Sequence, residues 1–94
     1  MQPCVYILAN RRNGTVYVGA TSDLGRRIWE HKSEVIEGFT KRYGLHTLVY
    51  AEFHTTMAEA ISRGKRIKNW RRAWKITLVE QLNPGWRDLS DQIG

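Results

Sequence analysis

The sequence has few of the features that mark exported, membrane-bound or disulfide-bonded proteins. Cys4 is the only cysteine, so neither an internal disulfide nor a thiol zinc site can form. No run of about 18 apolar residues is present, and the first residues lack a basic segment followed by a long apolar stretch. We therefore expect a cytoplasmic protein in which Cys4 is simply buried, and we expect neither export nor membrane insertion.

Residues that favour disorder are also scarce. The chain has two prolines and eight glycines among 94 residues, while 41% of its residues are hydrophobic and four are tryptophan. This composition is sufficient for a packed core, and the length leaves room for only one. We expect residues 1–94 to form a single folded domain.

Acidic residues are outnumbered: 15 Lys and Arg oppose nine Asp and Glu, for a net charge of +6. Such an excess is typical of proteins that bind polyanions, above all nucleic acids. Seven cations and no acid lie within residues 63–75, namely Arg63, Lys65, Arg66, Lys68, Arg71, Arg72 and Lys75. Like charges three and four residues apart repel on a helix, so a bound polyanion explains this run better than a solvated face does. Trp70 and Trp74 lie in the run and could stack on bases, although apolar spacing favours a core position for Trp74.

Three segments have the pattern of β-strands. Two short apolar runs, at residues 4–9 and 15–20, flank Asn13-Gly14, which is a strong hairpin signal. A third strand pattern follows at residues 47–53 and should complete a three-stranded antiparallel sheet. Tyr6 and Tyr17 then lie on neighbouring strands, and we expect them to project near one another.

Three segments have helical periodicity. The first starts at Ser22 or Asp23 and has Leu24, Ile28, His31 and Val35 on one face, with Arg27 four residues before His31. Residues 36–46 break the pattern at two glycines and are predicted to form a connecting loop. The second helix starts at Thr55 or Thr56, with Glu59 placed for a capping box, and its inner face is Met57, Ala60, Ile61, Gly64 and Ile67. The third spans about residues 71–82 and is predicted to bury Ala73, Trp74, Leu78 and Leu82.

An ordered set of sequence blocks resembles a known family. The opening "CVYILANRRNGTVYVGATSDLGRRIWEH" resembles that of the GIY-YIG nuclease superfamily, in the VYI and YVG spelling of its small stand-alone bacterial members. The similarity continues through "GFTKRYGLHTLVYAE", "AEAISRGKRIKNWRRAWK" and "NPGWRDL", nearly to the end of the chain. The resemblance implies an α/β (α+β) fold, with a small three-stranded antiparallel sheet flanked by about three helices. It also implies an endonuclease that hydrolyses phosphodiesters with one divalent metal, Mg²⁺ or Mn²⁺. We expect DNA ahead of RNA as its substrate, and a monomer or weak dimer.

The same resemblance suggests the site residues. Tyr6 and Tyr17 would be the active-site tyrosines, one of them activating or positioning water, with Arg27 on the scissile phosphate and His31 transferring or orienting a proton. A tyrosine with a pKa near 10 is a poor base unless a cation or metal lowers that pKa. Nucleic-acid contacts are expected from Lys41, Tyr43, Arg63, Lys65, Arg66, Lys68, Arg71 and Arg72. Three further positions are ambiguous: Gly19 belongs to the YVG block, Thr21 fits a site or a turn, and Asn83 fits a metal or phosphate site and a helix stop equally well.

Position 64 is where the chain departs from the family. The metal ligand of the family is a glutamate in a pattern like Arg-Glu-Lys-x-Ile-Lys, whereas this chain has Gly64 between Arg63 and Lys65. A glycine inside a helix costs roughly 1 kcal/mol relative to alanine, and it offers a hard cation no oxygen ligand. Glu59 is a poor substitute, since five residues turn a helix to a face about 140° away. Glu52 and Glu80 are carboxylates whose distance from the site the sequence does not define.

We therefore predict a chain that binds nucleic acid but cleaves it poorly or not at all, with metal binding weakened or lost. An engineered replacement of glutamate explains Gly64 better than a natural change does, because the other site residues are retained, and both origins stay open. A non-catalytic nucleic-acid-binding module is the alternative function. A third interpretation is an interaction domain whose basic helix docks an acidic protein.

Overall fold

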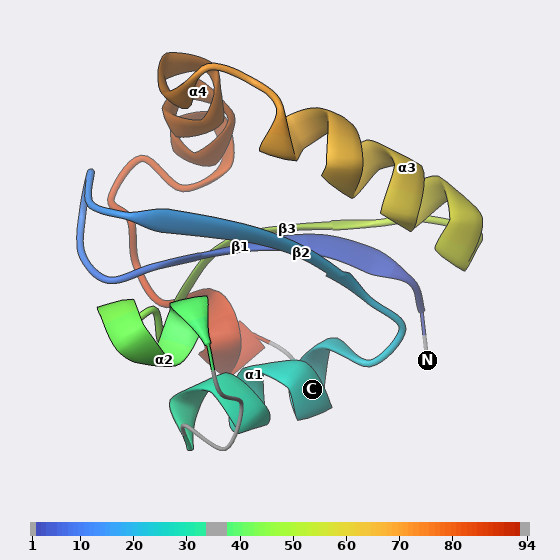
Figure 1. Cartoon of the computed structure of the whole chain (residues 1–94), viewed down its shortest axis with the longest axis horizontal. Coiled ribbons are helices and arrows are strands. Elements are labelled where there is room, and N and C mark those ends of the chain that lie inside the picture. Colours follow the sequence, from blue (N-terminus) through green and yellow to red (C-terminus); the bar gives the residue numbers. More distant parts are fainter. Residues whose placement is uncertain (1, 34–37, 93–94) are drawn as a thin grey trace.

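The fold is a sheet between two layers of helices. The computed structural model describes residues 2–33 and 38–92. In Figure 1 the sheet is seen nearly edge-on, with α3 and α4 on one face and α1 and α2 on the other. The elements in chain order are β1 (Cys4–Ala9), β2 (Val16–Thr21), α1 (Leu24–Lys32), α2 (Phe39–Tyr43), β3 (Thr47–Phe53), α3 (Met57–Lys68), α4 (Arg72–Leu82) and the 3₁₀ helix η1 (Leu89–Gln92).

The sheet has the order β2-β1-β3, and both strand pairs are antiparallel. This confirms the predicted three-stranded sheet: β1 and β3 have the predicted bounds, and β2 begins one residue later than expected. Residues 10–15 connect β1 to β2 through a turn in which Gly14 N donates to Arg11 O at 3.0 Å and Asn13 has a left-handed φ of 57°. All six residues of β1 are buried, so the central strand supplies both faces of the core.

Alternation along β1 divides the core into two halves. Val5 and Ile7 pack with Ile67 and Val79 on the side of α3 and α4, whereas the side chain of Tyr6 packs on the α1 side. The α1 half consists of Cys4, Tyr6, Leu8, Leu24, Ile28, Leu45 and Leu48. An irregularity in the β1–β3 pairing leaves Val49 as an extra residue, and Val49 and Tyr50 consequently share the α3 face.

Two helices begin at predicted caps. The Asp23 side chain accepts a hydrogen bond from Arg26 N at 3.2 Å at the start of α1. Thr56 Oγ1 accepts one from Glu59 N at 3.1 Å at the start of α3. These caps fix where α1 and α3 start, and so which residues of each helix face the sheet. Val35, predicted on the inner face of the first helix, lies outside the described residues.

The inner face of α3 matches the prediction except at Ile61. Ala60, Gly64 and Ile67 are buried, as predicted. Ile61 is 42% exposed because its side of α3 faces the edge of β2 rather than the centre of the sheet. The apolar side chain of Ile61 therefore lines a surface hollow and is not part of the core.

The predicted inner face of α4 was wrong at three of its four positions; only Leu78 is partly buried against the core. Trp74 and Leu82 are each 55% exposed, and Ala73 is exposed as well, whereas Val79 is the buried residue of this helix. Trp74 precedes Val79 by five residues and so lies about 140° around the helix from it. The rotation of α4 is fixed at its first turn, where Arg72 Nη2 donates to the carbonyl oxygens of Asn13 and Gly14 at 2.7 and 2.6 Å.

The segment predicted as a connecting loop contains the short helix α2 instead. Gly38 and Gly44 bound this helix, with φ values of 113° and 64°, rather than preventing it. Lys41 and Tyr43 consequently lie on a helix that covers the α1 side of the sheet. Within the described part of the chain, no helix is both long enough and apolar enough to cross a bilayer.

Candidate active site

A hollow of about 220 Å³ lies at the edge of β2. Because β2 is an edge strand, side chains from both layers of helices can reach around it. Tyr6, Tyr17 and Gly19 line the hollow from the sheet, and Arg27 lines it from α1. The α3 helix contributes Ile61, Gly64, Lys65 and Lys68. The structure thus brings together the tyrosines, Arg27 and position 64, which lie far apart in the sequence.

Three rings form a nearly equilateral triangle beside this hollow. The ring centroids are 6.3 Å apart for Tyr6 and Tyr17, and each tyrosine ring is 6.0 Å from that of His31. The Tyr6 hydroxyl is hydrogen-bonded to Nε2 of His31 at 3.3 Å, and both residues are buried. The predicted proximity of the two tyrosines is therefore observed, and His31 joins them from the inner face of α1.

Gly19 provides the space that the Tyr6 ring occupies. The two residues are directly opposed in the β1–β2 pair. A Cβ atom on Gly19 would lie 2.4 Å from Cζ of Tyr6, far inside contact distance. The glycine of the YVG block is therefore required by close approach, and it lets the tyrosine ring lie flat against the edge strand.

Burial controls the protonation of the Tyr6–His31 pair. It raises the pKa of Tyr6 far above the ordinary value, the nearby Tyr17 raises this pKa further, and Arg27 offsets only a part. Burial also lowers the pKa of His31, and the charge of Arg27 lowers it again. At neutral pH the phenol of Tyr6 keeps its proton and the imidazole of His31 is uncharged. These opposite shifts favour the neutral form of both partners, so Tyr6 alone is not a base at neutral pH.

The hollow is cationic on both sides. Arg27 approaches from α1, with its Nε 3.7 Å from a carboxylate oxygen of Glu30. Lys65 and Lys68 approach from α3, and Nζ of Lys68 lies 5.7 Å from the centroid of the Tyr17 ring. The residues that line the hollow include no carboxylate. An anion that enters meets positive charge from two helices, and the geometry suits a phosphate group.

The residues present do not fit a divalent metal ion. Gly64 carries no ligand atom, and the described residues contain no group of three His, Cys, Asp or Glu that could hold a metal. A Cβ atom at position 64 would meet Ala20 Cβ at 3.8 Å and Val5 Cγ2 at 4.0 Å, which are ordinary contacts. A longer side chain could therefore start from this position, but the chain has none there.

The three carboxylates considered as substitutes, Glu52, Glu59 and Glu80, lie elsewhere. Glu52 accepts hydrogen bonds from Arg63 Nε at 2.9 Å and from Tyr50. Glu80 accepts one from Trp86 Nε1 at 2.9 Å. Glu59 lines a different hollow, together with His54. None of the three lines the hollow beside β2, so none replaces the missing ligand.

Thr21 and Asn83 make local structural contacts. Thr21 Oγ1 accepts a hydrogen bond from Asp23 N at 3.1 Å, which shapes the turn into α1. Buried Asn83 donates through Nδ2 to the carbonyl oxygens of Val49 and Arg87, at 3.1 and 2.8 Å, and so ties the end of α4 to β3. Neither residue lines the hollow.

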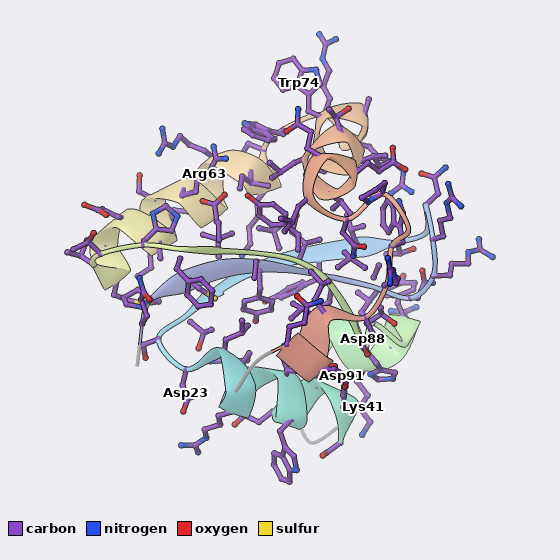
Figure 2. The ribbon with its side chains drawn as sticks, turned by 180° about the vertical axis from the view of Figure 1, so that it is seen from behind. Asp23, Lys41, Arg63, Trp74, Asp88 and Asp91 are labelled. Carbon is purple, nitrogen blue, oxygen red and sulfur yellow. The ribbon has the colours of Figure 1, made fainter. Side chains whose placement is uncertain are left out.

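The basic run of residues 63–75 does not form one uniform surface. Lys65 and Lys68 line the hollow, but Arg66 lies beside Glu59 in the other one. Arg63 is paired with Glu52, and Arg72 is bound to the hairpin turn. Lys41 (Figure 2) and Tyr43 belong to α2, which lies on the opposite face of the sheet from α3 (Figure 1). The sequence analysis missed Ile61 as a site residue, although its place three residues before Gly64 is a usable signal.

Comparison with known proteins agrees with this geometry. The family model described as the GIY-YIG catalytic domain matches residues 2–77, a segment that contains the whole hollow. The chain belongs to the GIY-YIG family. This confirms the resemblance seen in the sequence blocks, and it associates the GIY-YIG domain described here with a nuclease family.

Two relatives and one solved structure support the assignment. A UPF0213 protein of Staphylococcus epidermidis is 31% identical over 77 residues, which cover 82% of this chain and 93% of that protein. One from Staphylococcus aureus is 33% identical over 70 residues, 73% of this chain and 84% of that protein. The solution NMR structure of a UPF0213 protein from Bacillus halodurans is 28% identical to this GIY-YIG domain and has a TM-score of 0.58. That match covers 99% of this chain and 98% of the other, so the similarity extends over the complete fold.

Two alanine substitutions should have opposite effects on stability. Gly64→Ala should raise the free energy of unfolding by about 1 kcal/mol, because helix propensity improves and the new Cβ makes only ordinary contacts. Gly19→Ala should lower it by about 1–3 kcal/mol, because the Tyr6 ring must move. Urea unfolding of both variants measures the difference. A Gly19→Ala protein as stable as the parent would show that the Tyr6 ring does not depend on this glycine.

The pKa of His31 should respond to Arg27. Because folding lowers this pKa below its ordinary value of 6.5, the unfolded chain binds a proton at a pH where the folded chain does not. The contribution of neutral His31 to the free energy of unfolding is fully present above pH 6.5, and it is lost as the pH falls through the pKa of His31 in the folded chain. Arg27→Gln should raise the pKa of His31 in an NMR titration, whereas the matched Arg26→Gln should leave it unchanged. Equal shifts in both variants would contradict the stated role of Arg27.

Proposed function

We propose that this GIY-YIG domain binds nucleic acid by placing a backbone phosphate in the hollow beside β2, and that it cleaves the phosphodiester poorly or not at all. DNA is proposed ahead of RNA as the ligand. The observation that carries the proposal is the convergence of Arg27, Lys65 and Lys68 on a hollow without a carboxylate. Such a site has the charge to hold phosphate but not the oxygen ligands to hold a divalent metal beside it.

Each side chain has a distinct task in this proposal. The Arg27 guanidinium can donate two parallel hydrogen bonds to phosphate oxygens, and the two lysines neutralise charge from the other side. The Tyr6 hydroxyl, bonded to neutral His31, is placed to receive a proton from water while it passes its own proton to Nε2. Burial holds Tyr6 protonated, so proton transfer through Tyr6 and His31 does little on its own to activate water. Binding is therefore separated from cleavage in this chain.

The second candidate is a nucleic-acid-binding module with no latent nuclease activity. Two observations favour it: the absence of a carboxylate at the hollow and the raised pKa of Tyr6. Both candidates use the same phosphate contacts. They differ in what a carboxylate at position 64 would do, and a substitution there distinguishes them.

Gly64→Glu should confer DNA cleavage that depends on Mg²⁺ or Mn²⁺, because the carboxylate restores a metal ligand at the hollow. Gly64→Gln is the matched control: it has nearly the same size but no charge, and it should remain inactive. Cleavage is measured on gels with single-stranded, duplex and branched DNA. If Gly64→Glu cleaves none of them while it still binds, the chain is a binding module rather than a disabled nuclease.

Binding should weaken with salt in proportion to the phosphates contacted. Removing one contact, as in Lys68→Gln, should reduce the slope of log affinity against log salt by about 1. The control is Arg87→Gln, which removes an exposed charge from the turn after α4, away from the hollow. Fluorescence anisotropy with a labelled DNA duplex gives both slopes. Identical slopes for the two variants would show that phosphate does not contact Lys68.

A further inference from the structure

Two tryptophans form an aromatic surface at the corner between α3 and α4. Their ring centroids are 6.2 Å apart, with an interplanar angle of 78°. A hollow of about 250 Å³ is lined by both rings together with Thr77, Leu78 and Gln81. Figure 2 shows Trp74 pointing away from the body of the protein, in agreement with its 55% exposure. This hollow is separate from the one beside β2, and no residue lines both.

The two tryptophans differ in how they are held. Trp70 is half-buried and packs against the core on the α3 side, and the Arg63 guanidinium lies over its ring at 5.1 Å. Arg63 is itself fixed by Glu52, at 2.9 Å from Nε. Trp74 packs against neither half of the core. Trp70 is thus an anchored wall of the hollow, and Trp74 is a large apolar side chain presented to solvent, which is typical of a binding surface.

The surrounding charge indicates the kind of ligand. No acidic residue lies between Arg63 and Lys75 in the sequence, and Cζ of Arg71 lies over the Trp74 ring at 5.7 Å. Cations beside exposed aromatic rings are what single-stranded nucleic acid requires, because bases stack on the rings while phosphates meet the charges. A DNA duplex covers the faces of its bases, and an acidic peptide offers the indoles no stacking partner. The chemistry therefore favours an unpaired nucleotide.

The aromatic surface and the hollow beside β2 lie on opposite sides of the end of α3. Arg63, which lies over Trp70, pairs with Glu52 of β3, whereas Lys68 lines the hollow at β2, the other edge of the sheet. Asn69 alone separates Lys68 from Trp70, in a turn held by hydrogen bonds from Asn69 N to Arg66 O at 3.1 Å and from Trp70 N to Ile67 O at 3.0 Å. A nucleic-acid strand that contacts both places therefore passes around the end of α3.

We propose that Trp70 and Trp74 form a base-stacking subsite for an unpaired nucleotide, around the end of α3 from the phosphate site beside β2. The inference rests on the proposed function and adds its substrate class: nucleic acid with a single-stranded segment. Trp74 provides the accessible stacking face, and Arg71 neutralises the neighbouring phosphate. The subsite explains why a tryptophan occupies a solvent-facing position of α4.

The test compares Trp74→Ala with Trp29→Ala, which removes an equally large exposed residue (62% exposed) from α1 on the other side of the sheet. Affinity for a short oligo-dT strand should fall about 5- to 150-fold in Trp74→Ala and stay unchanged in Trp29→Ala. Affinity for a duplex of the same length should change in neither variant. Trp74→Phe should recover most of the lost affinity, which shows that an aromatic ring is what the strand requires.

Each contrary outcome has its own meaning. If the parent binds oligo-dT with a steep salt dependence and Trp74→Ala binds it equally well, the stacking subsite is wrong while the phosphate site stands. If the parent binds neither single strand nor duplex, the proposed function itself is wrong. If poly-glutamate binds the parent as tightly as oligo-dT and loses affinity in Trp74→Ala, the surface belongs to an acidic protein and the proposal is overturned. Circular dichroism of each variant checks that the fold is retained.

Discussion

The contact between Gly19 and the ring of Tyr6 is the constraint on which the site depends. With no Cβ on the edge strand, the ring lies against β2 and brings its hydroxyl within 3.3 Å of His31. The same placement buries Tyr6, which raises its pKa, and completes the triangle with Tyr17. A side chain at position 19 would displace all of this at once. The place of the Tyr6 ring at the edge strand, its hydrogen bond to His31 and its protonation follow from this one close approach.

The electrostatics of the site separate two properties that a nuclease normally combines. Cations from α1 and α3 converge on the hollow and favour an anion; Glu30 pairs with Arg27, but no carboxylate lines the hollow itself to favour a metal ion. Position 64 is buried against the sheet, and its surroundings accept a Cβ at ordinary distances. Close packing therefore does not explain the glycine. Because glycine has no side chain, the hollow lacks a carboxylate ligand for a metal ion at this position. In the proposed function the hollow therefore binds phosphate without supporting cleavage.

Local sequence signals were sufficient for much of the fold. The Asn13-Gly14 signal predicted the hairpin, and the caps at Asp23 and Thr56 fix which faces of α1 and α3 are buried. The strand register, in which Ala9 pairs with Val16 and Tyr6 comes near Tyr17, could not be derived from that signal, because the connection is longer than two residues. The rotation of α4 could not be derived in this way, because it depends on the Arg72 side chain reaching carbonyl groups of the hairpin turn, 58 and 59 residues earlier. Periodicity alone therefore placed Trp74 in the core, and its exposure became visible only in three dimensions.

Ile61 and α2 are two further features that the sequence pattern alone did not predict correctly. An apolar residue at a helical spacing indicates an inner face, but it does not indicate whether that face meets the centre of a sheet or its edge. Two glycines indicate breaks, but not whether a turn of helix fits between them. In both cases the missing information was the shape of the surrounding structure rather than the preference of the residue.

The central claim is that a nucleic-acid phosphate is held in the hollow beside β2 without a metal ion. An NMR titration of the ¹⁵N-labelled chain with a short DNA strand, in the presence of a chelator, tests it most directly. The largest shifts are expected at the amides of Gly19 and Gly64 and at the Arg27 side chain, with α2 and η1 nearly unchanged. Shifts centred on α2 or η1, with the hollow unaffected, would contradict it.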